Sequence, residues 1–302
     1  MPAESIQELP RYEVEGPTDA PVIVALGGIS AGYHIRATKA DPSAGWWEAA
    51  GEACPLPTTH FSLVGIAFLD GGAGDDGRPR RVVTTYDQAD AVAAVLDEIG
   101  VQRVHALVGA SYGGMVALAF AERYPERLER LIVIGATHRP HAMTMGLKAI
   151  QRRIVELGLE TGRAYDAVVL ARALAMTTFR SAREFDKRFD RQPEQSEPAV
   201  VFPVERYLIH QGKRFAARFT PARFLALSLS GDLHYVDPTK ITTPTTLIAA
   251  EGDTNVPREL VEELAASIGG PCRIVDLPSE TGHDAFLTEP EALGRILRDA
   301  LA

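Results

Sequence analysis

The feature that most constrains this 302-residue chain is the segment Gly109-Ala110-Ser111-Tyr112-Gly113. An apolar run precedes it at residues 104–108, and an apolar, helix-like stretch begins at Gly114. A serine between small residues, after a strand and before a helix, predicts a sharp turn whose strained backbone is tolerated because glycine and alanine take little space. The hydroxyl then projects above a sheet, and N–H groups of the helix can stabilise a developing negative charge. The alternative is a glycine-rich turn with an incidental serine, which the flanking strand and helix disfavour.

Short apolar runs bounded by glycine, proline or charge recur along the chain, at residues 22–26, 61–67, 131–134 and 246–250. Such runs suit strands that are buried on both faces of a parallel sheet. Helical patterns lie between several of them, at residues 88–99, 114–124, 258–268 and 289–301. This alternation predicts an α/β fold with right-handed crossovers and a mostly parallel sheet flanked by helices.

The alternation breaks between residues 139 and 237. Amphipathic patterns occupy this region, at residues 147–157, 163–177, 204–219 and 221–229. The polar segment at residues 191–198 contains two prolines and is predicted to be a loop, and no part of the region is a convincing strand. We therefore expect one core, formed by residues 1–138 and 238–302, with a helical lid inserted at residues 139–237.

Composition narrows the possible partners. The chain is 46% hydrophobic and 24% charged, as expected of a soluble globular protein, and its net charge of −9 disfavours binding to nucleic acid or anionic membranes. Residues 104–121 carry no charge and reach the length of a membrane span, but the glycine-rich centre favours strand, turn and buried helix.

Cysteine usage and the N-terminal sequence indicate the compartment. Cys54 and Cys272 lie far apart and lack metal-ligand spacing, so we expect neither a disulfide nor a metal site. Residues 1–10 lack the basic start and apolar core of a signal peptide. A reducing cytoplasm fits both observations.

A nucleophilic serine requires an acid and a histidine, which on this kind of scaffold follow it in that order. Asp253 directly follows the apolar run at residues 246–250, where a triad acid belongs, although a turn aspartate is the alternative. His283 lies in a loop before the last helix, and the other seven histidines are less well placed. Ser111, Asp253 and His283 are therefore the predicted catalytic residues.

Acyl chemistry also requires donors for the oxyanion. The N–H of Tyr112, directly after the serine, is predicted to be one of them. The second is expected from the glycine turn that follows residues 22–26, at Gly28 or at its neighbour Ile29, with Gly28 preferred because it lets a ligand approach closely.

These residues, together with motifs spread over nearly the whole chain, resemble the homoserine O-acyltransferases of the α/β-hydrolase fold. The motifs are Pro-Ser-Ala-Gly-Trp-Trp (42–47), Gly-Ala-Ser-Tyr-Gly-Gly-Met (109–115), Ile-Gln-Arg-Arg-Ile (150–154), Ala-Arg-Ala-Leu-Ala-Met-Thr-Thr-Phe-Arg-Ser (171–181), Val-Glu-Arg-Tyr-Leu (204–208), His-Gln-Gly-Lys-Arg-Phe (210–215) and Gly-His-Asp-Ala-Phe-Leu (282–287). The motifs in residues 139–237 and the last motif separate the chain from generic esterases.

The resemblance implies ping-pong transfer of an acyl group from acyl-CoA to L-homoserine, as in methionine biosynthesis, with acyl-CoA as a substrate and no cofactor. It further implies that Arg172 pairs with the carboxylate of the amino acid, that Asp284 faces its ammonium group, and that the lid forms a homodimer. Phe179 departs from the family pattern, in which a tyrosine is usual, and this leaves open whether homoserine or serine is the acceptor.

The acyl donor remains open between succinyl-CoA and acetyl-CoA, with succinyl-CoA slightly favoured. A succinyl carboxylate requires a cation or several N–H donors. The candidate arginines are Arg78, Arg80, Arg81, Arg139, Arg152 and Arg153. Two other functions fit the same residues: an esterase or lactonase with water as the acceptor, and a catalytically inactive ligand-binding protein.

Overall fold

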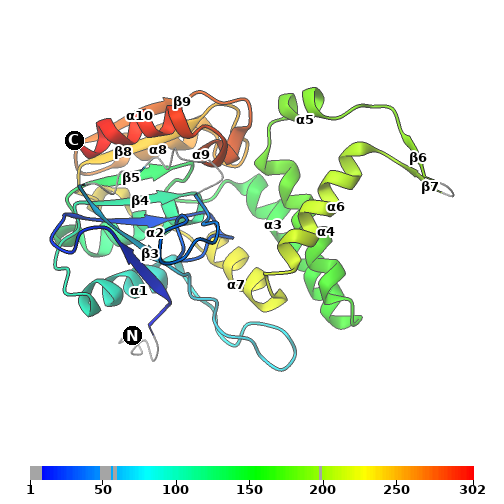
Figure 1. Ribbon diagram of the computed structural model, residues 1–302, viewed down its shortest axis with the longest axis horizontal. Coiled ribbons are helices and arrows are strands. Elements are labelled where there is room, and N and C mark those ends of the chain that lie inside the picture. The colour runs from blue at the N-terminus through cyan, green and yellow to red at the C-terminus, as the bar shows by residue number, and fades with distance from the viewer. Residues whose placement is uncertain (1–8, 48–55, 57–59, 197–198) are drawn as a thin grey trace.

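The computed structural model describes residues 9–47, 56, 60–196 and 199–302. Its centre is a seven-stranded sheet in the order β1-β3-β2-β4-β5-β8-β9 (Figure 1). The strands are β1 (Tyr12–Glu15), β2 (Val22–Leu26), β3 (Ser62–Ile66), β4 (Ala106–Ala110), β5 (Leu131–Ile134), β8 (Thr245–Ala250) and β9 (Cys272–Leu277). All neighbouring pairs are parallel except β1 with β3. The predicted mostly parallel sheet is confirmed.

The sheet is buried on both faces because successive strand residues point to opposite sides. On one face Val24 and Leu107 pack with α1 (Thr85–Glu98), α2 (Tyr112–Arg123) and α8 (Arg258–Ser267). On the other face Ile23 and Val108 pack with α10 (Pro290–Leu301). This double covering is why the strands appear in the sequence as continuous apolar runs.

Some predicted boundaries were wrong. The run at residues 104–108 pairs as a strand only from Ala106, and the strand continues to Ala110, because Ile23 to Leu26 of β2 lie opposite residues 106–109. Helix α1 begins at Thr85, before the predicted residue 88, because Thr84 and Asp87 form a capping box. The short edge strand β1 was not predicted.

Between β5 and β8 the chain forms the lid. Its helices are α3 (Ala142–Glu160), α4 (Ala164–Phe179), α5 (Ala182–Arg188), α6 (Pro203–Ala216) and α7 (Pro221–Asp232). The prediction that this region lacks strands was wrong, because β6 (Glu194–Ser196) pairs antiparallel with β7 (Ala199–Val201). Glu194–Ser196 falls within the predicted loop, because its polar sequence does not have the apolar pattern expected of a strand. The two strands form a short ribbon that projects from the lid (Figure 1).

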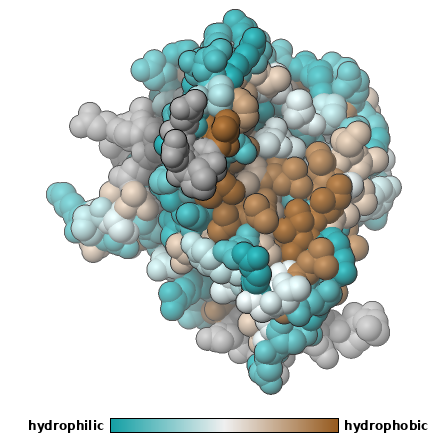
Figure 2. Space-filling model, turned by 90° about the vertical axis from the view of Figure 1, so that its right-hand side faces the viewer, coloured by the Kyte–Doolittle hydropathy of each residue, from teal (hydrophilic) through white to brown (hydrophobic). Residues whose placement is uncertain are grey.

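The lid end carries exposed apolar side chains. Figure 2 views this end, and brown residues gather over much of it. Exposed large apolar residues on α3 and α4 are Met143, Met145, Ile150, Leu157, Tyr165 and Leu170. Three of those on α3, Met143, Ile150 and Leu157, are seven residues apart and therefore lie on one face of the helix. Among the described residues, no helix has the length and apolar character needed to cross a membrane.

Candidate active site

Ser111 lies at the junction of β4 and α2. Its φ of 53° is positive, and no other described residue except glycine has a positive φ. The tight turn leaves no room for side chains at two neighbouring positions. A Cβ atom on Gly109 would lie 2.3 Å from the carbonyl oxygen of Gly113, and one on Gly113 would lie 2.3 Å from that of Leu26. These contacts explain the glycines of the motif and hold the strained serine at the C-terminal edge of the sheet.

Ser111, His283 and Asp253 form one hydrogen-bonded line. Ser111 Oγ lies 2.8 Å from His283 Nε2, and His283 Nδ1 lies 2.7 Å from Asp253 Oδ2. The other carboxylate oxygen of Asp253 accepts hydrogen bonds from the N–H groups of Asn255 and Val256, at 2.8 Å and 3.0 Å. The structure thus brings the three predicted residues together, with the acid held rigidly in the loop after β8.

The electrostatics of His283 suit a base paired with an acid. Burial lowers the pKa of His283, but the carboxylate of Asp253, by charge and by hydrogen bond, more than offsets this. The net pKa of His283 is raised above its ordinary value, with a smaller contribution from Asp284. A basic imidazole hydrogen-bonded to a hydroxyl can accept the proton of that hydroxyl during nucleophilic attack.

The predicted oxyanion donors flank Ser111. Tyr112 is the first residue of α2, so its N–H has no acceptor within the helix. A Cβ atom on Gly28 would lie 3.9 Å from Ser111 Cβ, which shows that the glycine loop after β2 runs beside the serine. Both residues are therefore near the reacting hydroxyl.

Two cavities meet at Ser111 and form one chamber. They share Ile29, Ser111, Arg172, Phe179 and His283. One, the lid lobe, is lined further by residues of α3, α4 and α7 and of the turn after α6, including Leu147, Lys148, Gln151, Phe219 and Ser228. The other, the loop lobe, is lined further by Gly28, Ser30, Trp46, Asp284, Phe286 and Leu287. Ser111 thus lies where the two lobes of the chamber meet.

Arg172 projects from α4 to the junction of these lobes. Its guanidinium lies 4.9 Å from the ring centroid of Phe179 and 4.8 Å from that of Phe215. Burial lowers the pKa of Arg172 to about 10, with Asp284 opposing. Within the described part of the chain no carboxylate lies at ion-pair distance from it. A charged guanidinium that lies between two aromatic rings and has no paired carboxylate is suited to bind a carboxylate ligand.

Asp284, the other predicted substrate residue, already has a protein partner. Arg180 Nε lies 2.9 Å from Asp284 Oδ2, and Arg180 Nη1 lies 3.3 Å from Glu184. Sequence reasoning did not identify Arg180, although it belongs to the motif at residues 171–181. Asp284 still lines the loop lobe, so the ion pair orients its carboxylate beside His283.

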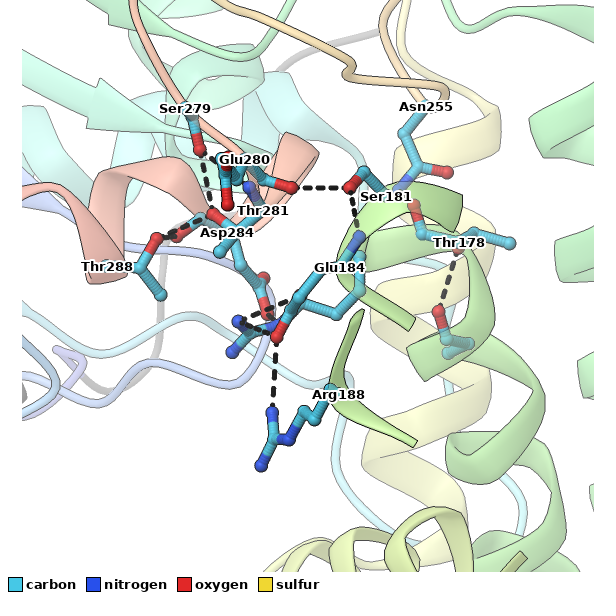
Figure 3. A network of polar contacts seen from close by, with 12 residues as sticks. Thr178, Ser181, Glu184, Arg188, Asn255, Ser279, Glu280, Thr281, Asp284 and Thr288 are labelled. Carbon is cyan, nitrogen blue, oxygen red and sulfur yellow. Dashed lines mark hydrogen bonds and ion pairs between the residues drawn. The ribbon is translucent and has the colours of Figure 1, made fainter. Parts of the chain in front are cut away.

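Further hydrogen bonds join the lid to the loop that carries His283. The N–H of Ser181 donates to the carbonyl oxygen of Thr281 at 3.0 Å, and the hydroxyl of Ser181 donates to that of Glu280 (Figure 3). On the acid side, the Asn255 amide donates to the carbonyl oxygen of Thr178 at 3.0 Å. The end of α4 is therefore bound to both loops that carry triad residues.

None of the six candidate arginines lines the chamber. Arg139 pairs with Glu263, Arg153 with Glu156 and Glu160, and Arg78 with Asp76. Arg152 pairs with Asp232 behind the lid lobe, and Arg80 and Arg81 are exposed. Within the described residues, Lys148 and Arg172 both line the lid lobe, and sequence reasoning missed Lys148 because one lysine on an amphipathic helix carries no distinguishing signal.

Among the described residues no cluster of three potential metal ligands occurs. Cys272 is a free thiol, whereas Cys54 and the first eight residues, on which the N-terminal expectation mostly depended, lie outside the described residues.

Comparisons with known proteins place this geometry in context. The family described as the alpha/beta hydrolase fold matches residues 21–290. The chain is 39% identical to homoserine O-succinyltransferase of Xanthomonas campestris pv. campestris, covering 96% of this chain and 78% of that protein. It is 29% identical to homoserine O-acetyltransferase of Thermobifida fusca, covering 100% and 91%.

Solved structures resemble the fold at low identity. The homoserine O-acetyltransferase of Bacillus anthracis superposes with a TM-score of 0.84 at 17% identity, covering 96% of this chain and 91% of that one. Esterase E22 superposes with a TM-score of 0.82 at 18% identity, covering 96% and 93%. The predicted α/β-hydrolase fold is confirmed, and the similarity to an esterase shows that the fold does not choose between acceptors.

Proposed function

Because the chain belongs to the homoserine O-acyltransferase family of the α/β-hydrolase fold, we propose that it transfers the acyl group of an acyl-CoA to the γ-hydroxyl of L-homoserine through Ser111. The chain is an acyltransferase of methionine biosynthesis. The observation that carries the mechanism is the line from Asp253 through His283 to Ser111, which opens into a chamber lined by Arg172.

In the first half-reaction His283 Nε2 accepts the proton of Ser111, and Oγ attacks the thioester carbonyl carbon. The N–H groups of Tyr112 and Gly28 stabilise the oxyanion. When the tetrahedral intermediate collapses, the C–S bond breaks and His283 returns the proton to the CoA thiolate. An ester between the acyl group and Ser111 remains.

In the second half-reaction the homoserine hydroxyl gives its proton to His283 and attacks this ester. The bond to Ser111 breaks, and His283 protonates Oγ. Arg172 binds the carboxylate of homoserine, and Asp284 faces its ammonium group. The reaction needs no cofactor, because each step moves one proton and forms or breaks bonds at one acyl carbon.

The lid supports transfer over hydrolysis. Helices α3, α4 and α7 cover the lid lobe, and α4 is fastened to both catalytic loops. A covered acyl-enzyme is protected from water until the amino acid arrives. The esterase or lactonase reaction is therefore the alternative function, and the following test distinguishes it from acyl transfer.

Intact-mass spectrometry after mixing with acyl-CoA alone should detect one acyl adduct on Ser111, and Ser111→Ala should form none. The release of CoA should then depend on homoserine. An adduct on another residue, or normal turnover by Ser111→Ala, would overturn the mechanism. Equal consumption of acyl-CoA with and without homoserine would identify a hydrolase, and ligand binding without any turnover would identify an inactive binding protein.

The role of Arg172 has a separate test. With acetyl-CoA as the donor, Arg172→Leu should lower kcat/KM for homoserine by about tenfold to a hundredfold, since a charge-assisted hydrogen bond is lost. Formation of the acyl-enzyme should change little. Arg163→Leu, at the exposed start of the same helix, is the matched control. An unchanged KM for homoserine in Arg172→Leu would refute the assignment.

We also propose that succinyl-CoA is the preferred donor, with acetyl-CoA as the alternative. The support is the 39% identity to the succinyltransferase of Xanthomonas campestris over nearly the whole chain. The proposed acceptor is homoserine. L-serine is the acceptor to compare with it, because Phe179 stands where the family usually has a tyrosine. The free thiol of Cys272 and the acyl-CoA substrate fit a cytoplasmic enzyme, and the exposed apolar face of the lid fits a homodimer.

A further inference from the structure

The strongest unassigned feature is a lysine inside the catalytic chamber. Lys148 of α3 lines the lid lobe together with Ser111 and His283. A Cβ atom on Gly231 would lie 3.0 Å from Lys148 Nζ and 3.8 Å from the ring of Tyr112, the residue after the nucleophile. The ammonium group therefore lies close to the start of α2, on the lid side of Ser111.

The charges around Lys148 do not balance. Its Nζ lies 3.5 Å from Asp232 Oδ1, but Arg152 Nη1 lies 2.6 Å from the other oxygen of the same carboxylate. The Asp232 side chain is only 6% exposed, and Arg152 also donates to Ser228 Oγ at 3.0 Å. Within the described residues, two partly buried cations share one buried anion.

Such an excess of partly buried positive charge is costly unless an anion joins it. Burial lowers the pKa of Lys148; Asp232 opposes the shift and Arg152 adds to it. A carboxylate in the lid lobe would supply the missing negative charge and accept a hydrogen bond from Lys148.

The chemistry of the two half-reactions places the acyl chain in the same lobe. The CoA thiol leaves from the side of the acyl carbon that the homoserine hydroxyl later attacks, because the second half-reaction follows the first in reverse. Arg172 and Asp284 place the acceptor at the loop lobe and its junction. The remaining space for the rest of the acyl group is the lid lobe.

We propose that Lys148 binds the terminal carboxylate of a dicarboxylic acyl group and thereby selects succinyl-CoA over acetyl-CoA. This inference depends on the proposed transfer through Ser111 and adds a specificity residue to it. Lys148 replaces the six arginines considered from the sequence, none of which lines the chamber.

The test compares three donors at saturating homoserine: succinyl-CoA, its neutral amide isostere succinamoyl-CoA, and acetyl-CoA. Wild type should use succinyl-CoA about tenfold to a hundredfold more efficiently than the amide, which has the same shape without the charge. Lys148→Met should lose this preference, so that its kcat/KM for succinyl-CoA falls to that for the amide. Lys148→Arg should restore most of the preference, since it restores the charge.

Arg153→Met is the matched control, because Arg153 is an exposed cation on the same helix, paired with Glu156 and Glu160. Its donor preference should equal that of wild type. Lys148→Met should fold, because it leaves Arg152 and Asp232 as a balanced pair. The wild-type comparison of succinyl-CoA with its amide tests the proposal even if the variant does not fold.

The outcomes separate this inference from the proposed function. If wild type acylates homoserine but does not distinguish succinyl-CoA from the amide, Lys148 has no such role and acyl transfer stands. An equal loss with all donors in Lys148→Met would also overturn it, since Lys148 would then act on the shared CoA portion or on folding. If none of the three donors supports acylation of homoserine by wild type, the proposed function fails, and this inference fails with it.

Discussion

At the scale of single residues, the contact between Asp253 and His283 controls the pH range of activity. The 2.7 Å hydrogen bond to Asp253 raises the pKa of His283 against the lowering effect of burial. Only the neutral imidazole can accept the serine proton. The kcat/KM for acyl-CoA should therefore rise with pH through an apparent pKa above the ordinary value of about 6.5, and it should decline as the pH drops below that pKa.

Replacing Asp253 should therefore change both rate and pH profile. Asp253→Asn removes the negative charge, so the acidic limb of kcat/KM should move to lower pH, and the rate should fall by a factor on the order of 10³ to 10⁴. Asp276→Asn, an exposed aspartate on β9, is the control and should keep the wild-type profile. A limb that stays in place in Asp253→Asn would show that another group sets it.

At the scale of elements, the turn from β4 into α2 depends on close approach to the loop after β2. A Cβ atom on Gly113 would lie 2.3 Å from the carbonyl oxygen of Leu26 and 2.6 Å from that of Gly27. Gly113→Ala should reduce the free energy of unfolding by about 1–3 kcal/mol, because backbone atoms cannot move aside as a flexible side chain can. Denaturant unfolding measures this change.

The control for this prediction is a helical glycine with free space around it. Nothing lies within 4 Å of a Cβ atom on Gly146 in α3. Gly146→Ala should raise the free energy of unfolding by about 0.5–1 kcal/mol through helix propensity. If both substitutions had the same sign, close packing at the turn would not explain the effect.

At the scale of the whole molecule, the exposed stripe Met143, Ile150 and Leu157 on α3 predicts a second copy of the chain against the lid. Covering an apolar helix face of this kind removes apolar surface from water, which is favourable. Ile150→Glu places a charge in the middle of the stripe and should convert the dimer to a monomer, as measured by light scattering at micromolar concentration.

Val14→Glu is the control, since Val14 is also half exposed but lies on β1, an edge strand of the sheet, and not on the lid. This variant should remain dimeric. A monomeric wild type, or an equal effect of both variants, would show that the stripe only covers the lid core.

The sequence by itself determined the parallel part of the sheet, the helices that alternate with its strands and the choice of Ser111, Asp253 and His283, whereas the edge strand β1 was not predicted. Those signals are local: buried strands are continuous apolar runs, and the serine, acid and histidine each follow a strand that ends at the same edge of a parallel sheet. The resemblance to a family then assigned Arg172 and Asp284.

Only the tertiary structure decided how the lid meets the core. The pairing of Arg180 with Asp284 and the sharing of Asp232 by Lys148 and Arg152 join residues on different elements. A single lysine or arginine on an amphipathic helix has the same sequence signature whether it faces water or a buried chamber. Its role follows from which anions the fold places beside it, and no local pattern records that.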